Sequence, residues 1–128
     1  MPDTFVSNPS FFKLDATLKK LRNYWQKNFD AQQKDITVDQ WLVIENLYKH
    51  KKTTHNELAR NTSKDITTIS RIAELLVRKG LVKREADVID RRKVHLQLTP
   101  AGQDKYKDVK SLVYDMRKIG WKTLTEED

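Results

Sequence analysis

The hydrophobic period changes twice along this chain, and that change limits the folds it can adopt. Before residue 80 and after residue 100, apolar side chains recur every three or four residues, which is the spacing of amphipathic helices. Between them, Val94, Leu96 and Leu98 alternate with polar residues, as in a half-buried strand. The short segment 81–84 is available to pair with that strand. The sequence therefore predicts a mainly α-helical protein with a small two- to three-stranded β unit.

Local signals indicate where the helices begin and end. Thr37, Thr54 and Asp65 are well placed as N-caps of three helices, and Pro9 and Pro100 suit the first turns of two longer ones. A polar run at 61–64, without apolar residues, is typical of a turn, and a glycine at position 80 is typical of a helix C-terminus. We expect helices over residues 8–34, 37–52, 54–60 and 66–79, and a further one from residue 100 onward.

Length and composition exclude several classes of protein. The 128 residues suit one domain spanning 1–128, and the absence of cysteine excludes disulfides, thiol nucleophiles and Cys-ligated metals. Three glycines form no phosphate-binding loop, and the three histidines have no metal-ligand spacing. No apolar run is long enough to span a membrane. We therefore expect a cytoplasmic protein that is not an enzyme and has no cofactor, no metal and no membrane partner.

Positive charge is concentrated in the middle of the chain. Residues 51–100 contain twelve Lys and Arg against six Asp and Glu, whereas residues 1–50 contain seven against six and residues 101–128 six against six. Basic charge confined to one segment indicates a polyanionic partner, with nucleic acid first and an anionic membrane surface second. A solvated basic surface is the alternative without a partner.

The order of elements gives that basic segment a specific architecture. Two short helices joined by a turn, followed by a basic hairpin, describe a winged helix-turn-helix over residues 36–99, in which the second helix of the pair can enter the major groove of DNA. The hairpin, or wing, can reach a neighbouring phosphate or the minor groove. Ordinary surface polarity and a solvated loop are the alternatives for these residues. The candidate DNA-binding residues are Thr67, Thr68, Ser70 and Arg71 on the helix, and Asp90, Arg91 and Arg92 on the hairpin.

Two motifs, in order and at the right spacing, resemble the MarR family of bacterial transcription regulators. The first runs from Glu57-Leu58-Ala59 through Thr68-Ile69-Ser70-Arg71 to Lys79-Gly80-Leu81-Val82-Lys83-Arg84. The second is the wing Asp87-Val88-Ile89-Asp90-Arg91-Arg92, followed by Leu98-Thr99-Pro100-Ala101-Gly102. The wing is similar to the family's Asp-Pro-x-Asp-Arg-Arg, with Val88 in place of the proline. The resemblance covers about residues 10–125.

The resemblance implies a repressor that reads pseudo-palindromic double-stranded DNA as a homodimer, with dimerisation helices at residues 8–34 and 100–128. It also implies that Asp90 and Arg92 form the structural pair of the wing while Arg91 is free to contact DNA. Thr125, followed by three acidic residues, is typical of a helix start, but no helix can follow it in this sequence. We therefore expect the family's last dimerisation helix to be missing.

Family members also respond to small aromatic effectors, which the resemblance implies bind between the dimerisation helices and the winged unit. The aromatic residues could line such a pocket, or could belong to the core or the dimer interface. A winged-helix module that binds protein rather than DNA is the alternative function, although the basic middle segment argues against it. The aromatic candidates are Trp25, Trp41, Tyr48, Tyr106, Tyr114 and Trp121.

Overall fold

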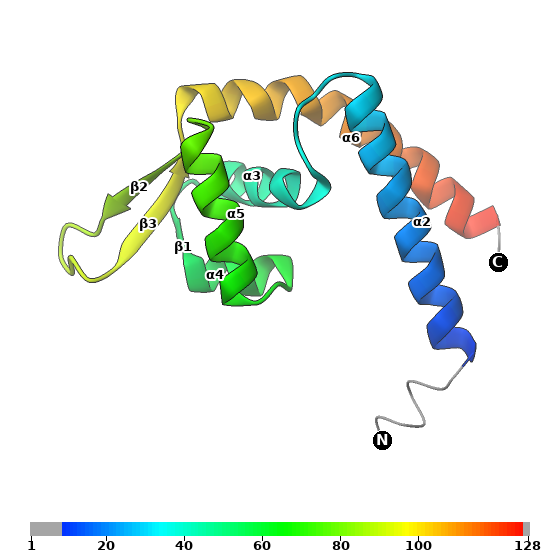
Figure 1. The fold of residues 1–128 in the computed structure, drawn as a ribbon, viewed down its shortest axis with the longest axis horizontal. Helices are drawn as coiled ribbons and strands as arrows, with labels where there is room; N and C mark the ends of the chain where they lie inside the picture. The colour runs from blue at the N-terminus through cyan, green and yellow to red at the C-terminus, as the bar shows by residue number, and fades with distance from the viewer. Residues whose placement is uncertain (1–8, 127–128) are drawn as a thin grey trace. The chain divides into compact units, whose positions relative to one another are not determined.

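The computed structural model describes the backbone of residues 9–126 and the side chains of residues 12–119, and over this range it contains five helices and a three-stranded antiparallel sheet (Figure 1). The mainly α-helical fold with a small β wing is therefore confirmed. No helix in the described range is both long and apolar enough to cross a membrane. In chain order the elements are α2 (Pro9–Ala31), α3 (Val38–His50), β1 (Thr53–Thr54), α4 (His55–Thr62), α5 (Ile66–Arg78), β2 (Val82–Ala86), β3 (Val94–Leu98) and α6 (Pro100–Glu126).

The chain divides into two compact units. One unit comprises the residues up to Val38 and from Val113 onward, and the other comprises Asp39–Leu112. Helix α6 begins in the second unit and ends in the first. It continues without a break to Glu126, so Thr125 lies within this helix and is not a helix start. A Thr beside acidic residues favours a cap locally, but the helical hydrogen bonds of the preceding turns outweigh that preference here.

Side-chain caps position the two helices of the helix-turn-helix. The hydroxyl of Thr54 accepts a hydrogen bond from the amide of Glu57 at 3.2 Å, and Asp65 Oδ1 accepts one from the amide of Thr68 at 2.7 Å. Both predicted caps are therefore confirmed. The turn is shorter than predicted because α4 extends through Thr62, and Ser63 ends it in the left-handed conformation with φ of 55°.

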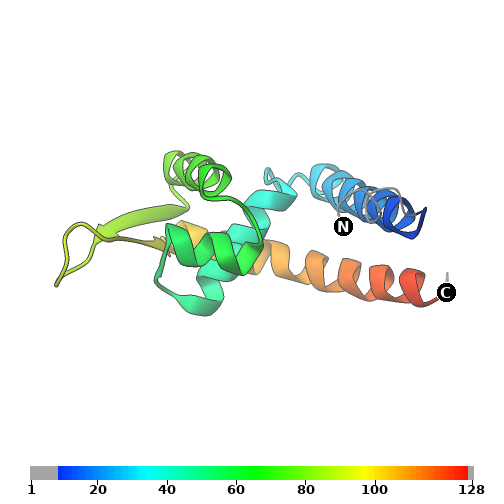
Figure 2. The ribbon, with the colours of Figure 1, turned by 90° about the horizontal axis from the view of Figure 1, so that it is seen from below.

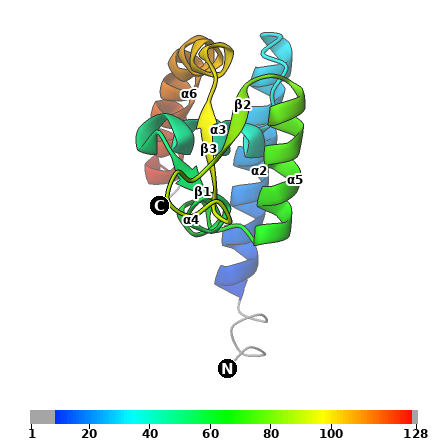
Figure 3. The same ribbon diagram turned by 90° about the vertical axis from the view of Figure 1, so that its left-hand side faces the viewer.

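The sheet has the order β1-β3-β2, with β3 in the middle (Figure 3). Strand β2 is longer than the segment 81–84 because Glu85 and Ala86 also pair with β3, opposite His95 and Val94. Strand β1 has two residues and pairs with β3 on the other side, opposite Leu96 and His95. The loop that joins β2 to β3 extends away from α4 and α5, as Figures 1 and 2 both show.

The core of the unit Asp39–Leu112 consists of the apolar faces of its helices and strands. The hydrophobic periodicity of the sequence predicts these faces. Trp41 is buried, its ring stacks on Tyr106 at 5.4 Å between centroids, and Tyr106 stacks on Tyr48 at 3.7 Å. The stack joins α3 to the first turns of α6. The other fully or nearly fully buried residues of this core include Leu47, Leu58, Ile69, Ile72, Ala73, Leu76, Leu81, Leu96 and Val109.

The apolar stripe of α2 is covered only near its C-terminal end. Phe29 is fully buried, whereas Leu14 is 58% exposed and Leu18 is 54% exposed. The side chain of Phe11, the first member of the predicted stripe, lies outside the described residues. Beyond α2, the side-chain amide of Gln26 holds the connection to α3: it donates to the carbonyl of Ile36 at 3.2 Å, and its oxygen accepts from the amide of Val38 at 3.0 Å.

The start of α6 is attached to the end of α5 by a junction at Thr99. The amide of Thr99 donates to the carbonyl of Leu81 at 3.0 Å, and its hydroxyl donates to the carbonyl of Gly80 at 2.6 Å. The same hydroxyl accepts from the amide of Gly102 at 3.0 Å and so caps α6. Gly80 has φ of +76°, and a Cβ built on Gly102 would collide with the carbonyl of Leu81. The local structure therefore explains both glycines of the sequence motif: Gly80 has a left-handed backbone, and Gly102 lies too close to the Leu81 carbonyl for a side chain.

We predict that Gly102→Ala lowers the free energy of unfolding by about 1–3 kcal/mol, because an added methyl group must displace backbone rather than a flexible side chain. Gly80→Ala should cost about 1–2 kcal/mol through its left-handed backbone alone, since no atom lies near the added Cβ. The exposed neighbour Gln103→Ala is the matched control and should change stability by less than about 0.5 kcal/mol. Urea denaturation followed by circular dichroism measures all three, and an unchanged midpoint for Gly102→Ala would contradict the junction described here.

Candidate nucleic-acid interface

Helix α5 presents a polar face to solvent beside its buried one. Thr67, Ser70 and Arg71 are exposed on its first two turns, opposite the buried Ile69. Thr68 is only partly exposed, and its hydroxyl donates to Asp65 Oδ2 at 3.1 Å. Three of the four predicted helix residues are therefore available to a partner, while Thr68 already serves the helix cap.

The cap carboxylate stays charged at neutral and mildly acidic pH. The amide of Thr68, followed by its hydroxyl, holds the pKa of Asp65 below its ordinary value, because both hydrogen bonds stabilise the charged form. Asp65 is thus committed to the helix start.

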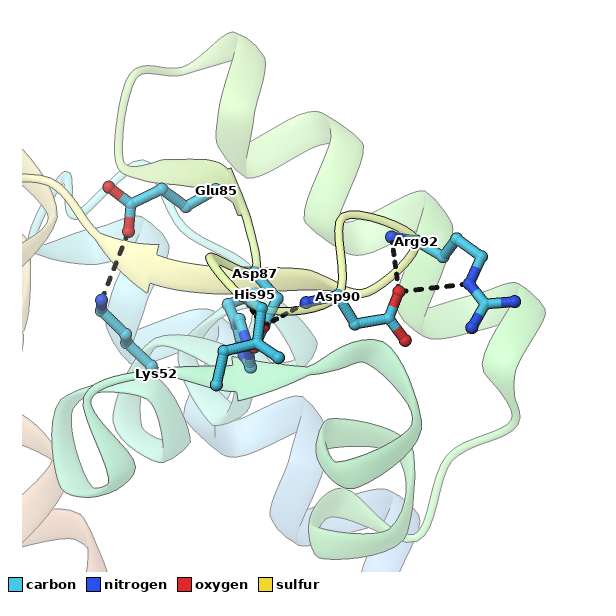
Figure 4. Close-up of polar contacts among 7 residues, drawn as sticks. Lys52, Glu85, Asp87, Asp90, Arg92 and His95 are labelled. Carbon is cyan, nitrogen blue, oxygen red and sulfur yellow. Dashed lines mark hydrogen bonds and ion pairs between the residues drawn. The ribbon is translucent and has the colours of Figure 1, made fainter.

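Asp87 organises the loop of the hairpin (Figure 4). Its Oδ1 accepts hydrogen bonds from the amides of Ile89 at 2.8 Å and Asp90 at 2.9 Å, and His95 Nε2 lies 2.7 Å from its Oδ2. The amide of Asp90 is the main reason that the pKa of Asp87 lies well below its usual range, followed by the bond to His95 and the amide of Ile89. One carboxylate therefore connects the turn to strand β3.

A second carboxylate holds the far side of the same loop. Asp90 Oδ1 accepts from both the amide and the Nε of Arg92, each at 3.1 Å (Figure 4). The amide of Lys93 donates to the carbonyl of Asp90 at 3.0 Å. The pairing of Asp90 with Arg92 agrees with the sequence analysis, and any part that these two residues play in DNA binding stays a prediction.

The tip of the hairpin carries the side chains left free by those contacts. Arg91 is exposed, and no carboxylate among the described residues lies within ion-pair distance of it. Val88 and Ile89 are each 96% exposed. These two apolar side chains lie beside the free guanidinium of Arg91, and their exposure to water is unfavourable.

A basic hollow lies between helix α4 and the hairpin. Its volume is about 730 Å³, and Ser70 is its lining residue on α5. Burial, followed by the positive charge of Arg84, lowers the pKa of His55 in its wall. Sequence reasoning missed His55 and Arg60 because neither belongs to the wing or the recognition helix. The lining residues are Thr54, His55, Asn56, Glu57, Arg60, Ser70, Arg84, Arg92, Lys93 and Val94.

Three of the predicted aromatic residues lie together in the fold. Trp41, Tyr48 and Tyr106 form the stack described above, and Tyr48 also lines a hollow of about 410 Å³ together with Lys51 and Gln103. Tyr114 is exposed beneath the ammonium of Lys118. Trp25 packs against Phe29 and Arg117, and the side chain of Trp121 lies outside the described residues.

Metal ligation has no support in the described part of the chain. It contains no group of three or more His, Cys, Asp or Glu side chains that could hold a metal ion. The pair of Asp87 and His95 is complete as a hydrogen bond within the hairpin. The exposed hydroxyl, guanidinium and ammonium groups of this surface are chemically suited to bind an anion.

Known proteins share both the sequence pattern and the fold. The sequence profile of the MarR family matches residues 36–94. An uncharacterized HTH-type transcriptional regulator of Staphylococcus aureus is 29% identical over 75 residues, which are 59% of this chain and 51% of that protein. The match thus spans about half the length of the curated relatives.

Solved structures extend the similarity beyond the winged unit. A mutant of MarR from E. coli complexed with operator DNA has a TM-score of 0.81 and 25% identity, covering 90% of this chain and 81% of that one. The S. aureus MepR–DNA complex has a TM-score of 0.80 at 23% identity, covering 94% and 85%. Bordetella bronchiseptica BpsR, whose DNA binding is regulated by 6-hydroxynicotinic acid, has a TM-score of 0.80 at 20% identity, covering 89% and 85%. At these sequence identities, the comparisons with MepR and BpsR show a shared fold only.

We predict that the Asp87 carboxyl titrates below its ordinary value of 3.8. The pKa of Asp87 is lower in the folded chain than in the unfolded chain. The hydrogen bonds of Asp87 therefore stabilise the hairpin at any pH above 3.8, and this stabilisation is lost as the pH falls through the pKa of the folded chain. His95→Leu should raise the midpoint while leaving it below 3.8, since the amides of Ile89 and Asp90 still donate. NMR titration of the carboxyl carbon measures both.

Glu74→Gln is the control for this titration. Glu74 lies on α5 and pairs with Arg78 at 2.7 Å, outside the hairpin and the Asp87 network. Its loss should leave the Asp87 midpoint unchanged. A midpoint at or above 3.8 in the parent protein would mean that the three contacts of Asp87 do not persist in solution.

Proposed function

Because this chain belongs to the MarR family through its winged helix-turn-helix at residues 36–94, we propose that it is a transcription regulator that binds double-stranded DNA as a homodimer. In this proposal α5 enters the major groove and the hairpin reaches the adjacent minor groove. The protein carries out no catalysis and acts in the cytoplasm, where bacterial DNA lies. Repression of transcription is the simplest consequence of occupying an operator.

One observation carries the DNA-binding proposal: a capped helix and a hairpin held by hydrogen bonds, both in the same compact unit, expose polar and cationic side chains. On α5 these are Thr67, Ser70 and Arg71, and on the hairpin the free guanidinium belongs to Arg91. Hydroxyl and guanidinium groups bind base edges and phosphates, and Arg is favoured in the negative potential of the minor groove. The similarity to E. coli MarR, which was solved in complex with operator DNA, supports DNA as the partner.

The roles of the wing residues follow from their contacts. Asp90 and Arg92 hold the loop, so their proposed contribution to DNA binding is to orient Arg91. Thr68 contributes through the helix cap and presents only part of its surface to DNA. Within the group predicted from sequence, the direct contacts are therefore assigned to Thr67, Ser70, Arg71 and Arg91.

The homodimer is supported by apolar surface that one chain leaves exposed. Phe12, Leu14 and Leu18 on α2 are more than half exposed, and Ile119 on α6 is half exposed. A twofold dimer places two identical winged units on one duplex, which requires a pseudo-palindromic operator with half-sites about one helical turn apart.

Release by a small aromatic effector completes the proposal. It is supported by the regulation of BpsR by 6-hydroxynicotinic acid, a property of that protein. In this chain the exposed ring of Tyr48, at the edge of the 410 Å³ hollow, is the aromatic surface that such a ligand could stack on.

The proposed function predicts salt-sensitive binding to duplex DNA. Each phosphate neutralised contributes about −0.9 to the slope of log K against log salt, so a dimer with several contacts should give a slope of at least about −4. Arg91→Ala should reduce this slope by about 1 for each wing and weaken the preference for A·T-rich flanks, without changing the melting temperature. Arg71→Ala should cost about 1–3 kcal/mol at one base position of a selected site. Fluorescence anisotropy and binding-site selection measure these effects.

Lys118→Ala serves as the control for these variants, because Lys118 contacts the Tyr114 ring and lies outside the winged unit. It should keep the parent's slope and site preference. A slope near zero for the parent protein would overturn the DNA-binding proposal and favour a module that binds protein.

The exposed stripe of α2 predicts how the dimer can be separated. Leu18→Ala and Leu14→Ala should each weaken dimerisation, by up to about 2–5 kcal/mol if the partner buries the side chain fully. Because both residues are exposed in the single chain, the helical content should change little. Sedimentation equilibrium measures the association, and Lys20→Ala on the same helix is the control. A parent protein that is monomeric at micromolar concentration would contradict the prediction.

A further inference from the structure

The tip of the hairpin carries two apolar side chains that the contacts assigned so far do not use. Val88 and Ile89 are adjacent in the loop between β2 and β3, and each is 96% exposed. Single apolar residues are common on protein surfaces, but turns and loop tips favour Gly, Pro, Asn, Asp and Ser. Val88 also stands where the wing motif of the family has proline. We refer to Val88 and Ile89 together as the apolar tip.

Hydrogen bonds of the loop fix the conformation of the apolar tip. The amides of Ile89 and Asp90 both donate to Asp87 Oδ1, at 2.8 Å and 2.9 Å. At the base of the loop, the amide of Asp87 donates to the carbonyl of Lys93 at 2.9 Å, and the amide of Lys93 donates to the carbonyl of Asp90 at 3.0 Å. Valine and isoleucine are branched at Cβ, which restricts their side-chain rotamers. The apolar tip therefore loses little conformational freedom when a partner covers it.

The surroundings of the apolar tip indicate the kind of partner that it fits. The loop extends away from α4 and α5, as Figures 1 and 2 show. Arg91 is exposed beside the apolar tip, and the side chain of Arg92 is 92% exposed although it pairs with Asp90. Such a surface is complementary to a partner that offers negative potential and apolar contacts together. The minor groove of DNA offers both, because deoxyribose rings form its walls and phosphates line its edges.

The inference rests on the proposed function, in which the hairpin reaches the minor groove. Proteins that bind this groove frequently insert an apolar side chain such as isoleucine between two base pairs, which partly unstacks the step and bends the duplex. We propose that the apolar tip is such a wedge, in which Ile89, supported by Val88, enters one base step beside each half-site. Insertion costs the stacking of that step, and burial of the two apolar side chains offsets the cost.

The wedge supplies a sequence preference that differs from that of Arg91. A guanidinium is attracted to the narrow minor groove of stiff A-tracts. A wedge requires a step that unstacks easily, and pyrimidine–purine steps such as TA are flexible in this way. The apolar tip therefore favours flanks with TA steps over A-tract flanks of the same A·T content. Hydrogen bonding in the minor groove scarcely distinguishes these two kinds of flank, because A·T and T·A present the same acceptors there.

The test uses the full chain and two duplexes that carry the site selected by the parent protein, one with alternating TA flanks and one with A-tract flanks. Single adenines of the TA flanks are replaced in turn by 2-aminopurine, whose fluorescence rises when it unstacks. The parent should bind the TA-flanked duplex more tightly and raise the fluorescence at one position in each flank. Ile89→Ser should abolish the rise and weaken binding to this duplex by at least about tenfold, which corresponds to the burial of one isoleucine side chain.

Two control variants separate the wedge from other effects. Ile89→Leu keeps an apolar side chain of similar size and should keep the fluorescence rise. Arg91→Ala should reduce the slope of log K against log salt, whereas Ile89→Ser removes no charge and should keep the parent's slope. Melting curves of the parent and the Ile89 variants should coincide, because this side chain is exposed in the folded chain.

The outcomes distinguish the failure of the wedge from the failure of the proposed function. If the parent binds DNA with a steep salt slope but Ile89→Ser matches its affinity and fluorescence, the wedge is overturned while the proposed function stands. If the parent shows no salt-dependent binding, the proposed function fails and the wedge fails with it. Sedimentation without DNA tests a second copy of the chain as the occupant. Assembly beyond a dimer in the parent that is absent in the double variant Val88→Ser, Ile89→Ser would assign the apolar tip to a contact between copies and overturn the wedge.

Discussion

The carbonyl of Leu81 is where the winged unit joins its helices to its strands. This carbonyl accepts a hydrogen bond from the amide of Thr99. The hydroxyl of Thr99 also donates to the carbonyl of Gly80 and caps α6. The end of α5, the start of β2, the end of β3 and the start of α6 therefore meet at this point. Gly102 allows this approach because any side chain there would occupy the space of that carbonyl. The direction in which the hairpin leaves the unit depends on this junction.

The hairpin depends on a second set of contacts, made by carboxylates. Asp87 accepts three hydrogen bonds, and Asp90 accepts two from Arg92. Their charges are used to order the loop, and the ordered loop leaves Arg91 exposed. Acidic residues thus fix the conformation of a basic hairpin. The distribution of charge along the sequence does not show this role.

The core of the winged unit and the exposed stripe of α2 belong to different parts of the protein. The winged unit is complete within one chain, since its core is closed by Trp41, Leu58 and Leu96. The stripe at Leu14 and Leu18 is not covered by the described residues of the same chain. Apolar surface of this kind is expected to be buried by association, which is why dimerisation belongs to the proposed function and can be tested separately from folding.

Local interactions explain why so much could be read from the sequence. Thr54 and Asp65 cap their helices through neighbours three residues away, Gly80 takes a backbone conformation that few other residues adopt, and the alternation over 94–98 reflects one buried face of a strand. Each of these depends on residues close together in the chain, so pattern is enough to predict it. The pairing of Asp90 with Arg92 is equally local.

Contacts between distant residues could be found only in the folded chain. His95 meets Asp87 because strand β3 returns beside β2, and Arg60 faces Arg84 and Lys93 because α4 packs against the sheet. The third strand at Thr53 exists because Leu96 lies opposite it, and nothing in two threonines indicates a strand. Sequence periodicity specifies which face of an element is buried, whereas the residues that share a hollow depend on how the elements pack, and that is a property of the tertiary structure.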